Sequence, residues 1–161
     1  MVPSPVFSAG LLFLTSPSTR LIALRPDGAG DVTKTHVAWT REEKVPDIAS
    51  PVSDGDLVFT VDSSGMVVCS DVKDGKKVWQ KDLDMEVESS PGIMGGRLFL
   101  LGKEGTLAIL NAGRAEPEIA RFPLPDKFYA SPAFAGGHVF LRGATNLYCL
   151  GPESAKLAKQ P

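Results

Sequence analysis

The chain has 161 residues, with 17 Lys and Arg against 19 Asp and Glu, so its formal net charge is −2. This near-neutral balance, without a basic run, excludes nucleic acid as the main partner, because phosphate binding needs clustered positive charge. No apolar run reaches the roughly 18–20 residues of a membrane helix, so we do not expect the chain to span a bilayer. The 16 Gly and 13 Pro make about 18% of the chain where ~12% is usual. Many turns between short strands are therefore predicted.

A Ser-Pro dipeptide recurs four times with the same pattern after it. The Pro residues are 46, 40 and 41 residues apart, and a Phe stands eight residues after each of them. These aromatic positions are Phe13, Phe59, Phe99 and Phe140. An aliphatic residue precedes each Phe, and a Gly follows each Pro after four or five residues. Self-similarity at this period indicates repeated supersecondary units.

Each copy is predicted to contain four short strands. In the second copy these are Ile48–Ser53, Leu57–Val61, Val67–Asp71 and Lys77–Lys81. Asp74-Gly75 supplies the turn before the last strand, because Gly tolerates the positive φ of such turns. The strands are continuously apolar, which predicts sheets buried on both faces.

Four-stranded sheets at a period of about 40–45 residues are typical of β-propeller blades. The predicted fold class is therefore all-β, with about four blades of four antiparallel strands in residues 1–151. The blades span about 3–46, 47–86, 87–127 and 128–151, and residues 152–161 form a C-terminal tail. The fourth copy stops at Leu150, before its outer strand, and Met1–Pro3 are too few to supply one. We therefore expect about 15 strands, as in half of an eight-bladed ring.

The segment from Cys69 to Trp79 resembles the tryptophan-docking repeat of PQQ-like (pyrroloquinoline quinone) propellers, Ala-x-Asp-x-x-Thr-Gly-x-x-x-Trp. Asp71, Gly75 and Trp79 match this pattern, whereas Cys69 and Asp74 stand where it has Ala and Thr.

The first copy keeps Ala23 and Trp39 around a turn that is six residues longer, and its sequence is similar to the C-terminal half of bacterial BamB-like PQQ-repeat proteins. The third copy has no Trp, and we expect Phe122 to take that place. This resemblance implies a chain that is the C-terminal half of a bacterial PQQ-repeat protein. It also implies a parent protein that is periplasmic or associated with the outer membrane.

Other candidate side chains are assigned structural roles. His36, in the strand leading to Trp39, and His138 have no partner at metal-ligand spacing, so no metal site is predicted. Cys69 and Cys149 share one column of the repeat and are interpreted as small buried packing residues. Charged residues at 41–44 and 82–88 are interpreted as solvated loop faces.

Two functions from different classes follow. The first is a non-catalytic protein-interaction scaffold of BamB type, with no cofactor and an unknown protein partner. The second is a fragment of a PQQ-dependent dehydrogenase, which implies PQQ and calcium with carboxylate and amide ligands. No such cluster stands in the sequence, so no enzyme is predicted. The apolar faces at the two ends of the arc also predict self-association.

Overall fold

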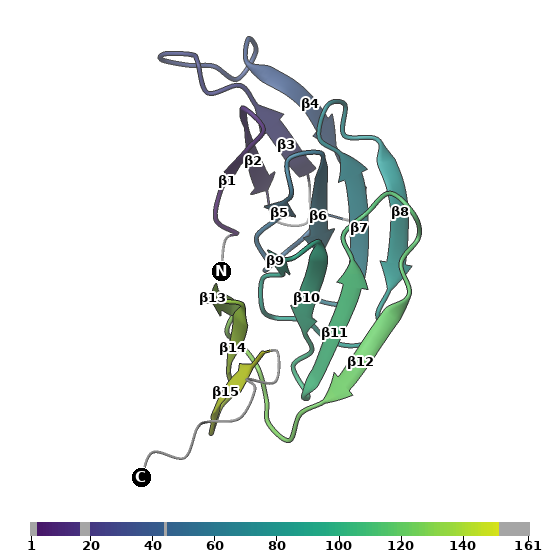
Figure 1. Ribbon diagram of the computed structural model, residues 1–161. Coiled ribbons are helices and arrows are strands. Elements are labelled where there is room, and N and C mark those ends of the chain that lie inside the picture. Colours follow the sequence, from purple (N-terminus) through teal and green to yellow (C-terminus); the bar gives the residue numbers. More distant parts are fainter. Residues whose placement is uncertain (1–2, 17–19, 44, 152–161) are drawn as a thin grey trace.

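The computed structural model describes residues 3–16, 20–43 and 45–151; the predicted tail at 152–161 lies outside this range. The described chain forms four antiparallel sheets arranged in an arc (Figure 1), which confirms the predicted propeller-like fold class. The first strand of each sheet lies on the inner side of the arc and the last strand on the outer side. Among the described residues, no helix has the length and hydropathy of a membrane span.

Each sheet is one blade, with its strands in sequence order. Blade 1 contains β1 (Val6–Ser8), β2 (Leu11–Ser16), β3 (Arg20–Leu24) and β4 (Val37–Arg41). Blade 2 contains β5 (Val52–Ser53), β6 (Leu57–Val61), β7 (Met66–Asp71) and β8 (Lys77–Asp82). Blade 3 contains β9 (Gly92–Met94), β10 (Arg97–Leu101), β11 (Thr106–Asn111) and β12 (Ile119–Pro123). Blade 4 contains β13 (Ala133–Ala135), β14 (His138–Arg142) and β15 (Leu147–Leu150).

The main difference from the predicted elements is at the inner strands. The first strand of blade 2 was expected over 48–53, but β5 is only Val52–Ser53. Pro51 precedes this strand, and Pro has no N–H to offer a ladder, so pairing with β6 begins after it. The three longer strands of this blade agree with the prediction to within one residue at each end.

Neighbouring blades share apolar clusters. Phe13 of blade 1 packs with Val58 of blade 2, and Phe59 of blade 2 packs with Leu98 of blade 3. Successive strand residues point to opposite faces of a sheet. Phe13, Phe59 and Phe99 therefore face the next blade, and Val58, Leu98 and Val139, each just before a Phe of the repeat, face the previous one. Blade 2 is covered on both sides, and all five residues of β6 are buried. The repeat therefore encodes one blade-to-blade packing arrangement.

Candidate functional site

Two tryptophans join neighbouring blades. The indole N–H of Trp39 donates to the carbonyl oxygen of Val72 in blade 2 at 2.8 Å. One blade further along, the indole N–H of Trp79 donates to the carbonyl oxygen of Gly113 in blade 3 at 2.7 Å. A buried indole N–H needs such an acceptor. Both tryptophans therefore serve as contacts between blades.

The ring packing is also repeated at these junctions. The centroids of Phe13 and Trp39 are 5.9 Å apart, and so are those of Phe59 and Trp79, with an interplanar angle of 46° in both pairs. Gly75 of blade 2 lies beneath the Trp39 ring, where an added Cβ would approach the ring to 2.5 Å. Its φ is +72°, which also favours Gly. Gly75 thus provides both the turn and the space for Trp39.

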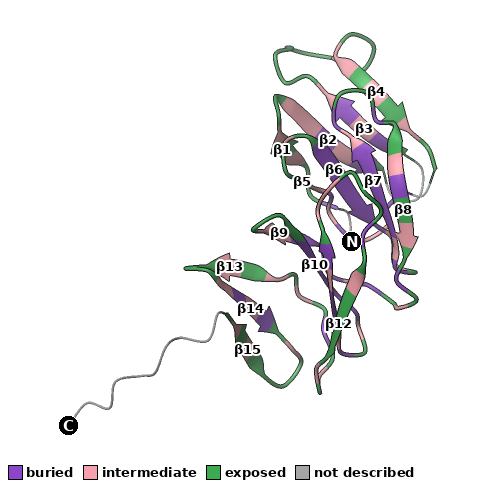
Figure 2. Cartoon of the chain, turned by 45° about the vertical axis from the view of Figure 1, so that its right-hand side comes forward, coloured by how far each residue is buried: buried purple, intermediate pink, exposed green. Residues whose placement is uncertain are grey.

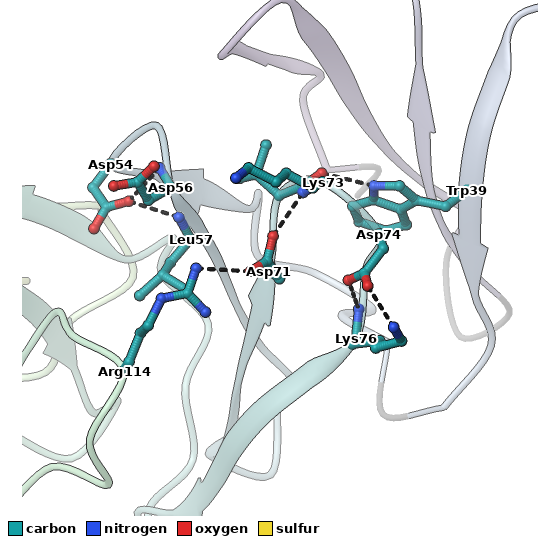
Figure 3. A network of polar contacts seen from close by, with 10 residues as sticks. Trp39, Asp54, Asp56, Leu57, Asp71, Lys73, Asp74, Lys76 and Arg114 are labelled. Atoms are coloured by element: carbon teal, nitrogen blue, oxygen red, sulfur yellow. Dashed lines mark hydrogen bonds and ion pairs between the residues drawn. The ribbon is translucent and has the colours of Figure 1, made fainter.

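Asp71, the acidic residue of the repeat, connects a turn to the next blade (Figure 3). One carboxylate oxygen accepts from the backbone N–H of Lys73 at 2.9 Å, and the other accepts from the guanidinium of Arg114 at 2.7 Å. These two partners lower the pKa of Asp71, the Lys73 hydrogen bond most of all. Arg114 directly follows Gly113, the acceptor for Trp79. One turn of blade 3 therefore receives two side chains of blade 2.

The residues opposite the tryptophans are small and buried. Ala23 pairs with Trp39, and Cys69 pairs with Trp79; both small residues are fully buried. Burial raises the pKa of the Cys69 thiol to about 12. The prediction that Cys149 is also buried is wrong, because Cys149 is exposed. No described strand covers β15, so this column of the repeat is open in blade 4.

The expectation that Phe122 replaces a tryptophan in the third copy is also wrong. The register places Ala120 opposite Ile109, in the column that Trp79 occupies in blade 2, and Phe122 lies opposite Leu107. Ala120 is exposed, and Phe122 is 48% exposed. The junction between blades 3 and 4 therefore forms without a docked tryptophan. Its cluster instead includes the fully buried Phe128.

The sequence predicted that Arg41 lies on a solvated loop face, and this prediction is wrong. Its guanidinium donates to Thr60 Oγ1 at 2.7 Å and to Ser70 Oγ. Both hydroxyls are almost fully buried within blade 2. Burial of the guanidinium lowers the pKa of Arg41 to about 10. Arg41 thus satisfies two buried polar groups of the neighbouring blade.

Two aspartates in the segments between blades bind the next hairpin, a role that the sequence did not predict. Asp47 accepts from the backbone N–H and the hydroxyl of Ser63, at 2.9 and 2.5 Å. Asp126 accepts from Thr145 Oγ1 at 2.9 Å and from the backbone N–H of Asn146 at 2.9 Å. Burial opposes ionisation of Asp126, but these hydrogen bonds outweigh it and lower the pKa to about 2.

The blade architecture and its tryptophan contacts agree with a comparison to known families. The family model described as outer membrane protein assembly factor BamB matches residues 28–118, more than half of the chain. The chain belongs to this family. Comparison with curated protein sequences gives no significant match.

Solved structures share the fold of this BamB-family chain. BamB from Moraxella catarrhalis is 19% identical with a TM-score of 0.68, over 88% of this chain and 42% of that one. Quinohemoprotein alcohol dehydrogenase from Comamonas testosteroni is 12% identical with a TM-score of 0.67, over 87% and 28%. The computationally designed Ika4 protein is 8% identical with a TM-score of 0.69, over 94% and 91%. The chain thus spans less than half of the two natural proteins.

Calcium and PQQ would need carboxylate and amide ligands beside a face for the quinone. No group of three or more His, Cys, Asp or Glu side chains in this part of the chain is placed to hold a metal ion. The indole N–H groups of both tryptophans donate to carbonyl oxygens of the following blade. Asn146 donates to Asp126. His36, in the turn just before β4, lies 3.6 Å from Asp27, and His138 contacts the Gly136 carbonyl.

A hollow lies between loops of blades 2 and 3. It has a volume of about 620 Å³ and is open to solvent. Asp84, Glu86 and Glu88 line it, together with Lys103, whose ammonium lies 2.8 Å from Glu88 and 3.5 Å from Glu86. The hollow is therefore acidic, and its one cation is already paired. Ser63 also lines the hollow, and its hydroxyl donates to the Asp47 carboxylate at 2.5 Å.

The outer edge of β15 is the second open feature of the BamB-family arc. In the other blades the third strand pairs with a fourth, whereas β15 pairs only with β14 among the described strands. Figure 2 shows this blade at one end of the arc, with much of β15 exposed. Leu147, its first residue, is 72% exposed. An edge of this kind presents unpaired backbone N–H and C=O groups to other chains.

Proposed function

We propose that the chain is a non-catalytic protein-interaction scaffold of BamB type, and that it binds an extended segment of another protein along the outer edge of β15. The observation that carries this proposal is the outer edge of β15, which pairs with no fourth strand among the described residues. Addition of a strand to an exposed edge is a common mode of peptide recognition, with backbone hydrogen bonds supplying affinity. The family description, an outer membrane protein assembly factor, is compatible with such binding.

The side chains of the repeat also support a non-catalytic role. Trp39, Trp79 and Asp71 all make contacts between blades. A catalytic site needs a nucleophile or an acid–base pair with a tuned pKa facing a pocket. In the acidic hollow the Ser63 hydroxyl donates to Asp47; burial opposes ionisation of this carboxyl, but its hydrogen bonds lower its pKa, which makes it a weak base. We therefore infer that the chain binds neither PQQ nor calcium. The family description, an outer membrane protein assembly factor, also supports a location in the periplasm or at the outer membrane, which we propose for this protein.

The experiment uses a peptide that copies β8, Lys-Lys-Val-Trp-Gln-Lys-Asp-Leu (residues 76–83). In blade 2 the Trp of this segment pairs with Cys69, so in blade 4 it would pair with Cys149. We expect saturable slowing of amide hydrogen exchange at residues 147–150 in the 161-residue chain. The matched control is the same peptide with alternate backbone amides N-methylated, which removes donors but keeps side chains. Equal effects of both peptides, or no slowing with either, would contradict the proposal.

A further inference from the structure

A ladder of serine hydrogen bonds runs along the inner side of the arc. The backbone N–H of Ser4 donates to Ser50 Oγ at 2.8 Å, and that of Ser50 donates to Ser90 Oγ at 2.9 Å. The N–H of Ser90 donates to Ser131 Oγ at 3.0 Å. Each blade thus donates to the next one. Within the described residues the ladder is open at both ends, because Ser131 N–H has no acceptor and Ser4 Oγ has no donor.

The backward face of blade 1, which points away from blade 2, is apolar and open. It consists of residues that alternate with the buried ones along β1, β2 and β3. These residues are Phe7, Leu12, Leu14, Ile22 and Leu24. Phe7 lies opposite Leu12 in the sheet and is 64% exposed, and the other four are half-buried. Such a patch of exposed apolar side chains marks an interaction surface.

The forward face of blade 4, which points away from blade 3, is the second open face. It carries Phe140, the aromatic of the repeat, together with His138, Arg142, Leu147 and Cys149. Phe140 is half-buried and Cys149, opposite it, is exposed. In the other blades the corresponding aromatic contributes to a cluster with the following blade: Phe13 with Val58, and Phe59 with Leu98 and Leu100. Phe140 has no following blade in the described chain.

The two open faces are complementary by the rule that governs the junctions inside the chain. Each internal junction joins a forward face containing the repeat Phe to a backward face of mostly aliphatic residues. Blade 4 presents such a forward face and blade 1 such a backward face. A docked tryptophan is not needed for this contact, because the junction of blades 3 and 4 already forms without one.

We propose that the chain binds a second copy of itself head to tail, with the forward face of blade 4 on the backward face of blade 1 of the other copy. Two such contacts, related by a two-fold axis, close a ring. The Ser131 N–H of one copy then donates to Ser4 Oγ of the other, so the ladder continues around the ring. Head-to-head contacts would break its direction, because two Ser131 donors or two Ser4 hydroxyls would meet. The outer edge of β15 plays no part in this contact.

The first test is the mass of the full chain by light scattering coupled to size exclusion at tens of micromolar. We expect twice the 17.1 kDa of one chain. Phe7→Glu, on the backward face of blade 1, and Leu147→Glu, on the forward face of blade 4, should each halve this mass. Both side chains are mostly exposed, so neither change removes core packing. The matched control is Phe122→Glu, an exposed Phe at neither end face, which should leave the mass doubled.

The second test separates head-to-tail contacts from other dimers. A mixture of the Phe7→Glu and Leu147→Glu proteins retains one intact interface per pair, so it should recover part of the doubled mass that each variant loses alone. Alkylation of Cys149 should also be faster in Phe7→Glu than in the unaltered chain, because the ring covers that thiol. A 17.1 kDa monomer, an open-ended mass distribution, or no recovery in the mixture would overturn the proposal.

Discussion

Trp79 and Gly113 lie 34 residues apart in the sequence, yet the indole N–H of Trp79 donates to the Gly113 carbonyl oxygen at 2.7 Å. The indole is almost fully buried, with only 6% of Trp79 exposed. The next residue, Arg114, binds Asp71 from the same blade as Trp79. Blades 2 and 3 are therefore held by an apolar anchor and an ion pair that meet at one turn.

Trp79→Ala should strongly destabilise the fold. Truncation of a buried Trp or Phe costs about 3–5 kcal/mol of unfolding free energy, since contacts are lost and a cavity remains. Trp79→Phe keeps a ring and loses the hydrogen bond to Gly113, so it should cost less. Urea unfolding followed by circular dichroism measures both changes. An unaltered midpoint for Trp79→Ala, with loss of binding to some ligand, would show that Trp79 is a ligand-binding residue.

Gly75→Ala should destabilise the fold through two effects. An L-residue at φ of +72° costs about 1–2 kcal/mol, and the new Cβ would also meet the Trp39 ring at 2.5 Å. The control is Gly10→Ala, since Gly10 has a similar φ of +77° and no atom within 4 Å of the added Cβ. Urea unfolding of the two variants gives the comparison. Equal losses of stability in the two variants would mean that the Trp39 ring shifts to make room for the added Cβ with no loss of unfolding free energy.

The sequence predicted the fold because its signals are repeated. The Phe of each copy and the aliphatic residue before it face opposite neighbours, so their spacing carries the blade packing directly. Gly75 and Trp79 belong to a repeated motif, and the structure places both at blade junctions. These residues act through local turn geometry and the strand register, which a sequence reveals.

The polar contacts between blades were not visible in the sequence. Arg114 meets Asp71 across 43 residues, and Arg41 reaches two hydroxyls buried in blade 2. Such pairs depend on how far a long side chain extends over a neighbouring sheet, and they are not repeated in every copy. The exposure of Cys149 was missed for a related reason. The column of the repeat records strand position, whereas burial also depends on the strand and the blade beside it.

The two cysteines should differ sharply in reactivity towards a thiol reagent at pH 8. The thiolate is the reactive form, and burial both raises the pKa of Cys69 to about 12 and blocks its access. Cys149 is exposed in the single chain. We expect alkylation of one thiol per chain in the native protein and of two in urea, with peptide mass spectrometry locating the first at Cys149. The Phe7→Glu background keeps Cys149 uncovered. Native modification of Cys69 would show that the junction of blades 2 and 3 opens readily.

Stability should fall in acid partly through Asp126. Its folded-state pKa of about 2 lies below the ordinary value of 3.8, so its carboxylate stabilises the fold at pH values above the ordinary pKa. That contribution is lost as the pH falls from about 4 towards 2, because the unfolded state takes up the proton first. The ionised carboxylate accepts hydrogen bonds from the Thr145 hydroxyl and the Asn146 backbone N–H, which stabilise the charged form.

Asp126→Asn should therefore lower stability at neutral pH and flatten the dependence of unfolding free energy on pH between about 4 and 2. Urea unfolding at several pH values gives the difference between this variant and the unaltered chain, which cancels the contribution of the other carboxylates. Glu42→Gln removes the same charge from an exposed position and serves as the control. If the difference in unfolding free energy between the variant and the unaltered chain stays constant across this pH range, the prediction is wrong. Protonation of Asp126 would then leave its hydrogen bonds to the hairpin of blade 4 intact, and its negative charge would not contribute to stability.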